Sequence, residues 1–221
     1  MGPCISTPDT VGNSIPRNTS LDATCFKDTK VPIIFLIGGP GAGKAKHCAR
    51  LASKYGFTRI SAGKLIRDEV TEGTERSRII GDIITCGKLI PADVMLEMIK
   101  RKMLENRESP GFVLDGYPRQ TIQGKMFEQE VAPVDLVIYL EVNERILKDR
   151  LLGRAASSGR IVQDMEAVKG RIQIFRKNAP KVLKYYKSKL VTIKAEFDAE
   201  DIFEQICEAI DKIPGKTIPG S

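Results

Sequence analysis

The sequence predicts an α/β protein in which a parallel β-sheet is buried between layers of helices. From residue 31 onward, short and continuously apolar β-prone runs alternate with longer stretches of helical character. This alternation is typical of a parallel sheet with both faces covered. The chain of 221 residues suits one domain, and its 42% of hydrophobic residues suffices for a sizeable core.

Five β-prone runs are expected to form the sheet. They are IIFLI at 33–37, FTRIS at 57–61, FVLDG at 112–116, LVIYLEV at 136–142 and LVTIK at 190–194. In the helix expected after the first run, Cys48, Leu51, Ala52 and Tyr55 share one face. A further set, expected to pack in the core, consists of Met95, Met98 and Met103. Ligands should collect where the carboxyl ends of the strands meet.

The two ends of the chain are expected to lie outside this domain. Residues 1–30 are rich in Pro, Ser, Thr, Asn and Asp without periodicity, which is typical of a disordered leader. The start MGPCIS loosely matches an N-myristoylation pattern. Because Pro3 stiffens the segment after Gly2, we expect no lipid anchor there. Residues 214–221 are expected to be a flexible tail, and GKT at 215–217 lacks the upstream glycine of a phosphate loop.

The composition limits the class of partner. Lys and Arg outnumber Asp and Glu by 35 to 28, a net charge of +7, which suits nucleic acid, an anionic surface or small phosphate-rich ligands. Trp is absent and only 6% of residues are aromatic, so we expect small phosphates and no nucleic acid. No apolar run approaches the ~20 residues of a transmembrane segment. Five widely spaced cysteines without a CxxC predict free thiols, with neither a disulfide framework nor a zinc site, in a cytoplasmic protein.

The strongest chemical signal is GGPGAGK at 38–44, which follows a β-prone run and opens a helix. In that context GxxxxGK predicts a phosphate-binding loop. Backbone N–H groups and the positive helix end would hold phosphate oxygens, while Lys44 reaches the later phosphates. Asp115 ends a β-prone run, where a carboxylate either holds waters around Mg²⁺ or caps a turn. Arg119 is a candidate phosphate clamp, and the Gln123 amide can pair with a purine edge.

In combination these motifs resemble the adenylate kinase family of nucleoside monophosphate kinases. GGPGAGK, SAGKLIRDE, GKLIPADVMLEMI, GFVLDGYPRQTIQG and RLLGRAASSGR…KGR stand in the family's order and spacing, from about residue 31 to 212. The resemblance implies a P-loop NTPase fold over 31–213, a mobile monophosphate-binding arm at about 61–91 and a mobile lid at about 153–165. The short AASSG lid is similar to that of the cytosolic short form, and a monomer is expected.

The resemblance also implies a role for each site residue. ATP would bind at Gly39, Gly41, Ala42, Gly43, Lys44, Ala45, Lys46, Arg150 and Arg154. AMP would bind at Ala62, Arg67, Ile90, Gly116, Arg119, Gln123, Arg160 and Arg171. The catalytic set, which neutralises the transferring phosphoryl group, would be Lys44, Arg119, Arg154, Arg160 and Arg171. Asp115 would hold Mg²⁺ through water, and the implied reaction converts ATP and AMP reversibly into two ADP.

The chain departs from the family pattern near the expected site. The family continues its loop with Gly-Thr-Gln, whereas this chain has Ala-Lys-His at 45–47. Lys64 stands where the family has an acid, and residues 162–163 are Val-Gln instead of two lid aspartates, with Asp164 one place late. His47 is expected to be an exposed helix residue without a part in proton transfer.

Three functions therefore stay open. We favour a working adenylate kinase with reduced turnover, because most of the charged groups that neutralise phosphates survive. The first alternative is a catalytically impaired nucleotide-binding relative with a regulatory role. The second is a kinase that prefers UMP or CMP, which Ala62 suggests and Gln123 opposes.

Overall fold

The computed structural model describes residues 14–18, 20–157 and 163–219. Within them, all five expected strands form one sheet in the order β2-β3-β1-β4-β5, and every pairing is parallel. The strands are β1 (Ile33–Gly38), β2 (Thr58–Ser61), β3 (Phe112–Asp115), β4 (Leu136–Glu141) and β5 (Leu190–Lys194). The α/β class and the parallel sheet are thus confirmed.

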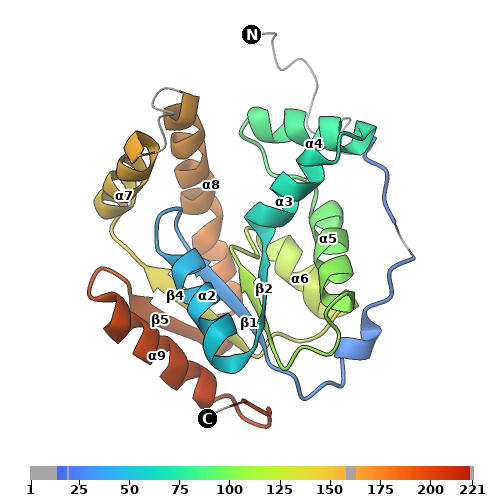
Figure 1. Cartoon of the computed structure of the whole chain (residues 1–221), viewed down its shortest axis with the longest axis vertical. Helices are drawn as coiled ribbons and strands as arrows, with labels where there is room; N and C mark the ends of the chain where they lie inside the picture. The colour runs from blue at the N-terminus through green and yellow to red at the C-terminus, as the bar shows by residue number, and fades with distance from the viewer. Residues whose placement is uncertain (1–13, 19, 158–162, 220–221) are drawn as a thin grey trace.

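Helices cover both faces of this sheet (Figure 1). The α-helices are α2 (Lys44–Tyr55), α3 (Ala62–Thr71), α4 (Glu75–Thr85), α5 (Ala92–Leu104), α6 (Thr121–Glu130), α7 (Glu144–Ser157), α8 (Gln163–Tyr185) and α9 (Ala199–Asp211). Two short 3₁₀ turns are η1 (Thr24–Phe26) and η2 (Lys187–Lys189). Helices α2 and α9 pack on one face, while α5, α6 and α8 pack on the other. No described helix combines the length and apolarity that crossing a membrane requires.

Strand β1 shows why its run is continuously apolar. Side chains alternate between the two faces of a strand, so Ile33, Phe35 and Ile37 enter the core beside α5 and α6. Ile34 and Leu36 enter the other core, beside α2 and α9. All five side chains are buried, as expected for the central strand of a sheet that helices cover on both sides.

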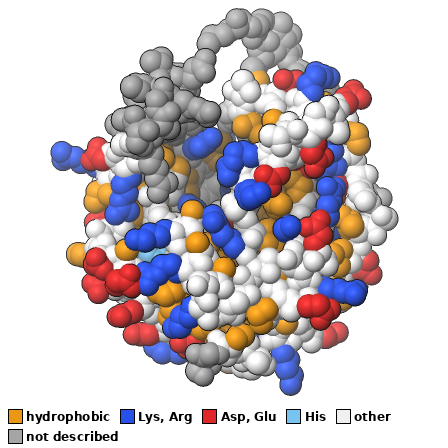
Figure 2. Space-filling view, in the orientation of Figure 1, with side chains coloured by type: hydrophobic (Ala, Val, Ile, Leu, Met, Phe, Trp, Pro, Cys, Tyr) orange, Lys and Arg blue, Asp and Glu red, His pale blue; other side chains and the backbone are white. Residues whose placement is uncertain are grey.

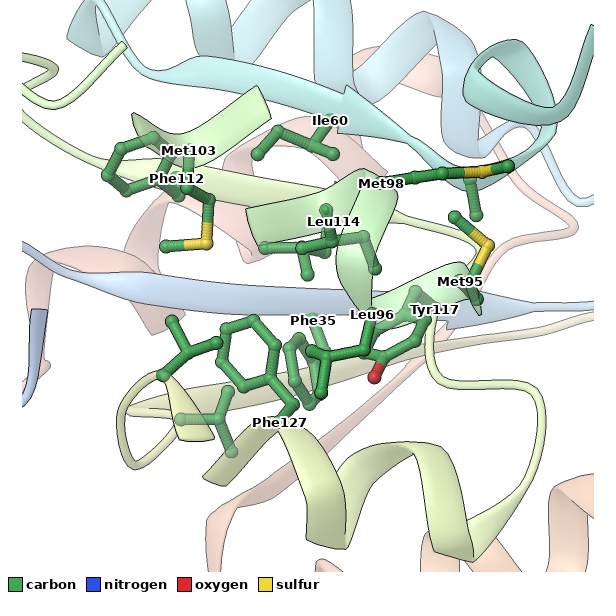
Figure 3. Close-up of a cluster of buried hydrophobic side chains, with 14 of the residues drawn as sticks. Phe35, Ile60, Met95, Leu96, Met98, Met103, Phe112, Leu114, Tyr117 and Phe127 are labelled. Carbon is green, nitrogen blue, oxygen red and sulfur yellow. The ribbon is translucent and has the colours of Figure 1, made fainter. Parts of the chain in front are cut away.

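The core beside α5 and α6 contains the three methionines that the sequence placed there. Met95, Met98 and Met103 are 2%, 4% and 0% exposed and lie among the aromatic and aliphatic side chains drawn in Figure 3. Phe35 makes edge-on contact with Phe127, their ring centres 5.2 Å apart. On the other face, the predicted apolar side of α2 is also confirmed, with its members Cys48, Leu51 and Tyr55 buried.

Part of the leader that we expected to be disordered is packed on the domain. Ile15, Ala23 and Phe26 are at most 4% exposed and belong to the core beside α5. The Arg17 guanidinium also lies 2.6 Å from the Asp93 carboxylate at the start of α5. The apolar residues of the leader are too sparse to show periodicity, but each finds an apolar neighbour once the helices are assembled. Residues 1–13 lie outside the described residues.

The end of the chain is likewise held to the domain. Lys216 Nζ lies 3.1 Å from the Asp135 carboxylate and donates to the Thr29 carbonyl oxygen at 3.0 Å. The Thr217 N–H donates to the Lys30 carbonyl oxygen at 3.3 Å. The flexible tail expected at 214–221 is therefore tied down as far as Thr217, and Lys216 has structural partners instead of a phosphate.

The cysteines only partly follow the expectation of free thiols. Cys25, Cys48 and Cys207 are free, and Cys48 and Cys207 are buried. Cys86, which follows α4, is disulfide-bonded. Wide spacing in a sequence does not exclude a disulfide, because the fold decides which cysteines meet.

Candidate active site

The phosphate loop connects the carboxyl end of β1 to the start of α2. Gly41 and Gly43 have φ angles of +92° and +89°, in the left-handed region that favours glycine. The Lys44 ammonium donates to the carbonyl oxygens of Gly38 at 2.7 Å and Gly39 at 2.9 Å. The lysine thus folds back over the loop, at the end of the sheet where ligands bind in parallel α/β folds.

The glycines of the loop also allow α7 to approach. A Cβ at Gly39 would lie 2.5 Å from Leu147 Cδ1, and one at Gly41 would lie 3.1 Å from the Leu147 carbonyl oxygen. Helix α7 leads toward the expected lid. The small residues of the loop therefore set how closely this helix packs against the phosphate site.

Three arginines from different elements converge beside the loop. Arg67 is on α3, Arg119 precedes α6 and Arg171 is on α8. A Cβ at Gly63 would lie 3.3 Å from Arg67 Nη1 and 3.9 Å from Arg119 Nη2, so both guanidinium groups lie over the start of α3. Figure 2 shows Lys and Arg side chains gathered around a hollow on this face of the molecule.

The electrostatics of these arginines favour an anion. Burial lowers the pKa of the Arg119 guanidinium, and the charges of Arg171 and Arg67 lower it further, while Asp115 opposes the shift. Converging cations repel one another, and a phosphate group placed among them would relieve that repulsion. The cluster is therefore suited to bind the phosphate of a second ligand next to the loop.

Asp115 ends β3, next to the phosphate loop. Its side chain is 8% exposed, and one carboxylate oxygen lies 2.6 Å from Arg59 Nη2 on the neighbouring strand β2. Gly116 follows with a φ of +72°, and a Cβ there would lie 3.8 Å from Lys44 Cε. Sequence reasoning missed Arg59, because only the pairing of β2 with β3 brings it to Asp115.

Gln123 lies beside Arg119 on the first turn of α6. The side-chain Oε1 of Gln123 accepts a hydrogen bond from the Arg119 backbone N–H at 2.7 Å, and Gln123 is 2% exposed. The Tyr117 hydroxyl donates to the Gln123 carbonyl oxygen at 2.6 Å. Ala62 and Ile90, also expected on the AMP side, are 1% and 4% exposed.

A cavity of about 180 Å³ lies between the loop and the start of α9. Lys46, His47 and Arg150 line it together with loop residues. Arg150 Nη1 donates to the Ala195 carbonyl oxygen at 3.2 Å, which fixes its guanidinium at the cavity wall. Phe197, an aromatic side chain in the same lining and 69% exposed, was not anticipated from the sequence.

His47 is not the exposed residue that we expected. It is 3% exposed, and its ring stacks on Phe203 of α9 with centres 6.4 Å apart. Burial, followed by the nearby Arg50 charge, lowers the pKa of His47 to about 4. His47 is therefore neutral at pH 7, which leaves Lys46 as the extra cation in the first turn of α2.

Two further departures from the family pattern face solvent. Ala45 is exposed on the first turn of α2. The Lys64 ammonium forms an ion pair with Asp68 at 2.5 Å, and both side chains are more than half exposed. The Ser61 hydroxyl still caps α3 by accepting from the Lys64 N–H at 3.4 Å. The positive charge at position 64 is thus paired with a carboxylate on the same helix.

The lid expected at about 153–165 lies largely outside the described residues. Arg160 and Val162 fall in the segment 158–162, and the side chains of Arg154, Gln163 and Asp164 are also outside the description. Their assigned roles stay predictions. Within the described residues, no group of three or more His, Cys, Asp or Glu side chains is placed to hold a metal ion.

Comparison with known proteins agrees with this geometry. The model of the family described as "Adenylate kinase" matches residues 36–191. The chain is 41% identical over 195 residues to adenylate kinase isoenzyme 1 of Caenorhabditis elegans, covering 86% of this chain and 93% of that protein. It is 38% identical to adenylate kinase isoenzyme 1 of Gallus gallus, covering 82% and 95% of the two chains. It is 39% identical to adenylate kinase 1 of Drosophila melanogaster, covering 82% and 80%.

Proposed function

This chain belongs to the adenylate kinase family, and from that membership we propose that it transfers a phosphoryl group reversibly between ATP and AMP, with two ADP as product. The observation that carries the proposal is that the loop with Lys44 and the arginines Arg67, Arg119 and Arg171 lie near one another at one end of the sheet. The loop would form one anion site and the three arginines would form the other. Two phosphate chains bound there would meet end to end.

Phosphoryl transfer needs alignment and charge neutralisation more than a protein nucleophile. Loop amides and Lys44 would hold the β- and γ-phosphates of ATP, and Arg150 would line the cavity that takes the rest of ATP. Arg67 and Arg119 would hold the AMP phosphate. Arg171, with Arg154 and Arg160 of the lid, would neutralise the group in transit, because planar guanidinium groups match phosphate oxygens.

Magnesium fits the donor set as a water-mediated ligand. Mg²⁺ usually retains several waters and binds through one or two carboxylates plus substrate phosphates. Asp115 supplies such a carboxylate at the end of β3, near Lys44. When bound with ATP, the ion would neutralise charge on the phosphates. The ion pair between Arg59 and Asp115 must open or share its carboxylate for this to happen.

Reduced turnover forms part of the proposal. Lys46 stands where the family has a threonine, so this position offers no hydroxyl beside the phosphates, and losing one oriented polar group typically costs ~2.7–4 kcal/mol of transition-state stabilisation. Such a loss slows an enzyme by about 10²–10³, and the remaining cations can still neutralise charge on the phosphates.

The enzyme would act as a cytoplasmic monomer, and light scattering tests the oligomeric state.

AMP is the proposed acceptor because Gln123 lies next to Arg119. The Arg119 N–H holds one end of the Gln123 amide, which fixes the group that would read the base relative to the arginine that would bind the phosphate. Turnover on AMP, UMP and CMP tests this assignment. A preference for UMP or CMP would replace AMP with a pyrimidine acceptor, as Ala62 suggests.

A coupled assay of ADP formation from ATP and AMP tests the reaction itself. We expect Lys44→Ala to abolish the activity of the purified protein, while Lys216→Ala, in the GKT sequence near the end of the chain, retains it. Equal rates for wild type and Lys44→Ala would favour the impaired nucleotide-binding relative. Calorimetric titration with a bisubstrate dinucleotide then tests the pocket itself, since absence of binding would contradict both the working kinase and the impaired nucleotide-binding relative.

A further inference from the structure

The ion pair between Arg59 and Asp115 lies within the proposed magnesium site. Arg59 Nη2 donates to Asp115 Oδ2 at 2.6 Å. The Asp115 side chain is 8% exposed, and that of Arg59 is 32% exposed. The carboxylate is thus fixed at the end of β3, whereas about a third of the Arg59 side chain is exposed, although its Nε is buried without a hydrogen-bond partner.

The surroundings of Asp115 contain more positive than negative charge. Arg59 pairs with it directly, and the Lys44 side chain passes the adjacent Gly116. Burial raises the pKa of the Cys48 thiol, and the Asp115 charge raises it further, so this neighbour is a neutral thiol. The carboxylate therefore has one cationic partner, Arg59, and a second cation, Lys44, in its neighbourhood before a metal ion arrives.

We propose that Arg59 is a positioning residue that competes with Mg²⁺ for Asp115 and so sets the magnesium concentration at which ATP binds. The inference rests on the proposed function, since it concerns the same site. A charge-assisted hydrogen bond is roughly twice as strong as a neutral one, and waters on Mg²⁺ need the same carboxylate lone pairs. The guanidinium also repels an approaching divalent cation.

The exposed fractions decide which partner moves. Asp115 is buried at the sheet end and leaving its carboxylate unpaired would be costly. Arg59 keeps about a third of its side chain in solvent. Binding of Mg²⁺ with ATP therefore releases Arg59, and the Asp115 carboxylate exchanges one cationic partner for another and stays paired throughout.

Calorimetric titrations of ATP at a series of Mg²⁺ concentrations test the proposal without relying on turnover. Arg59→Gln keeps a hydrogen-bond donor but removes the charge. In this variant, the Mg²⁺ concentration at which the affinity for ATP reaches half of its maximum should fall roughly three- to tenfold. Arg59→Lys, which keeps the charge, should stay within about twofold of wild type. Arg78→Gln, which removes an arginine from an exposed pair with Asp82 on α4, should match wild type. The same Mg²⁺ dependence in Arg59→Gln and wild type would overturn the proposal.

The role of Asp115 is tested in the same assay. In an Asp115→Asn background, replacing Arg59 by Gln should no longer change the Mg²⁺ dependence. If ATP fails to bind wild type at every Mg²⁺ concentration, the proposed function fails. If ATP binds but its Mg²⁺ dependence ignores Arg59, only the present inference fails.

A measurement on wild-type protein tests the proposal even if Arg59→Gln does not fold. The Nε–H signal of Arg59 in a ¹⁵N NMR spectrum, assigned by its loss in Arg59→Lys, should move when ATP and Mg²⁺ are added together. ATP with a chelator should leave it near its starting position. A signal that ATP with Mg²⁺ does not move would show that the ion pair stays closed, which contradicts the proposal.

Discussion

The Arg76 guanidinium on α4 lies 3.1 Å from the Glu97 carboxylate on α5, and both side chains are mostly buried. Arg76 also pairs with Glu69 on α3 at 2.7 Å. One guanidinium therefore joins the two helices of the expected monophosphate-binding arm to a helix that packs on the sheet.

Removing the Glu97 charge should loosen that junction. Breaking a buried ion pair by removing one partner costs up to ~3–5 kcal/mol, and Glu69 retains part of the interaction, so we expect Glu97→Gln to lose about 3 kcal/mol. Urea unfolding monitored by circular dichroism measures the free energy of unfolding. Glu105→Gln is the control, because Glu105 pairs with Lys102 at the surface and should change stability by less than ~1 kcal/mol. Equal losses in the two variants would contradict the prediction.

Ile15 should contribute to stability although it lies in the leader. It is 2% exposed in the core beside α5, and replacing a buried Ile by Ala typically costs ~2–5 kcal/mol. We expect Ile15→Ala to lower the free energy of unfolding by about 2 kcal/mol, the smaller value because its segment is short. Ile122→Ala, at a position 52% exposed on α6, should have little effect. If Ile15→Ala is as stable as wild type, this part of the leader does not contribute to the core.

His47 should make the fold less stable in mild acid. Its pKa is lowered in the native state to about 4 from ~6.5 in the unfolded chain. Between these values the unfolded state binds more protons, so the stabilisation is complete above pH ~6.5 and is lost as the pH falls toward ~4. Wild type should lose roughly 2–3 kcal/mol over this window relative to His47→Phe. Unfolding curves of both proteins at pH 7 and pH 4.5 give the difference, and parallel losses would contradict the shift.

Gly124 should not tolerate a methyl group. A Cβ at Gly124 would lie 2.4 Å from the Tyr186 hydroxyl oxygen and 3.0 Å from its ring. Tyr186 is 2% exposed and cannot easily move, so Gly124→Ala should cost about 1–3 kcal/mol by overpacking. Gly81→Ala, with only one contact at 3.8 Å, should gain up to ~1 kcal/mol from helix propensity. Thermal unfolding of both variants shows whether their effects have opposite signs.

Arg119 should serve activity at the expense of stability. Its lowered pKa shows that burial and neighbouring arginines disfavour the charge. Arg119→Gln should therefore reduce kcat/KM for AMP by about 10²–10³ without lowering the melting temperature of the nucleotide-free protein. Steady-state kinetics with AMP and with ATP as the varied substrate, beside thermal unfolding, test both halves. A change confined to the KM for ATP would place Arg119 on the other side of the site.

Local patterns in the sequence predicted the strands of the sheet and the position of the glycine-rich loop. All five β-prone runs became strands, and the three that are nearly continuously apolar, β1, β3 and β4, are buried between the two layers of helices. The loop at 38–44 was equally predictable, since its glycines and Lys44 act through backbone geometry that neighbours in sequence determine. In the described residues, Arg67, Arg119 and Arg171 are near one another, and the roles that the resemblance implies for them stay predictions.

The strand-forming runs and the phosphate loop could be predicted from the chain alone, because each depends on residues that are close together in sequence. The tertiary structure decided which distant residues meet. The pairing of β2 with β3 brings Arg59 to Asp115, and the packing of α9 on α2 buries His47 against Phe203. Contacts of this kind depend on strand order and helix packing, and no spacing within one segment encodes either.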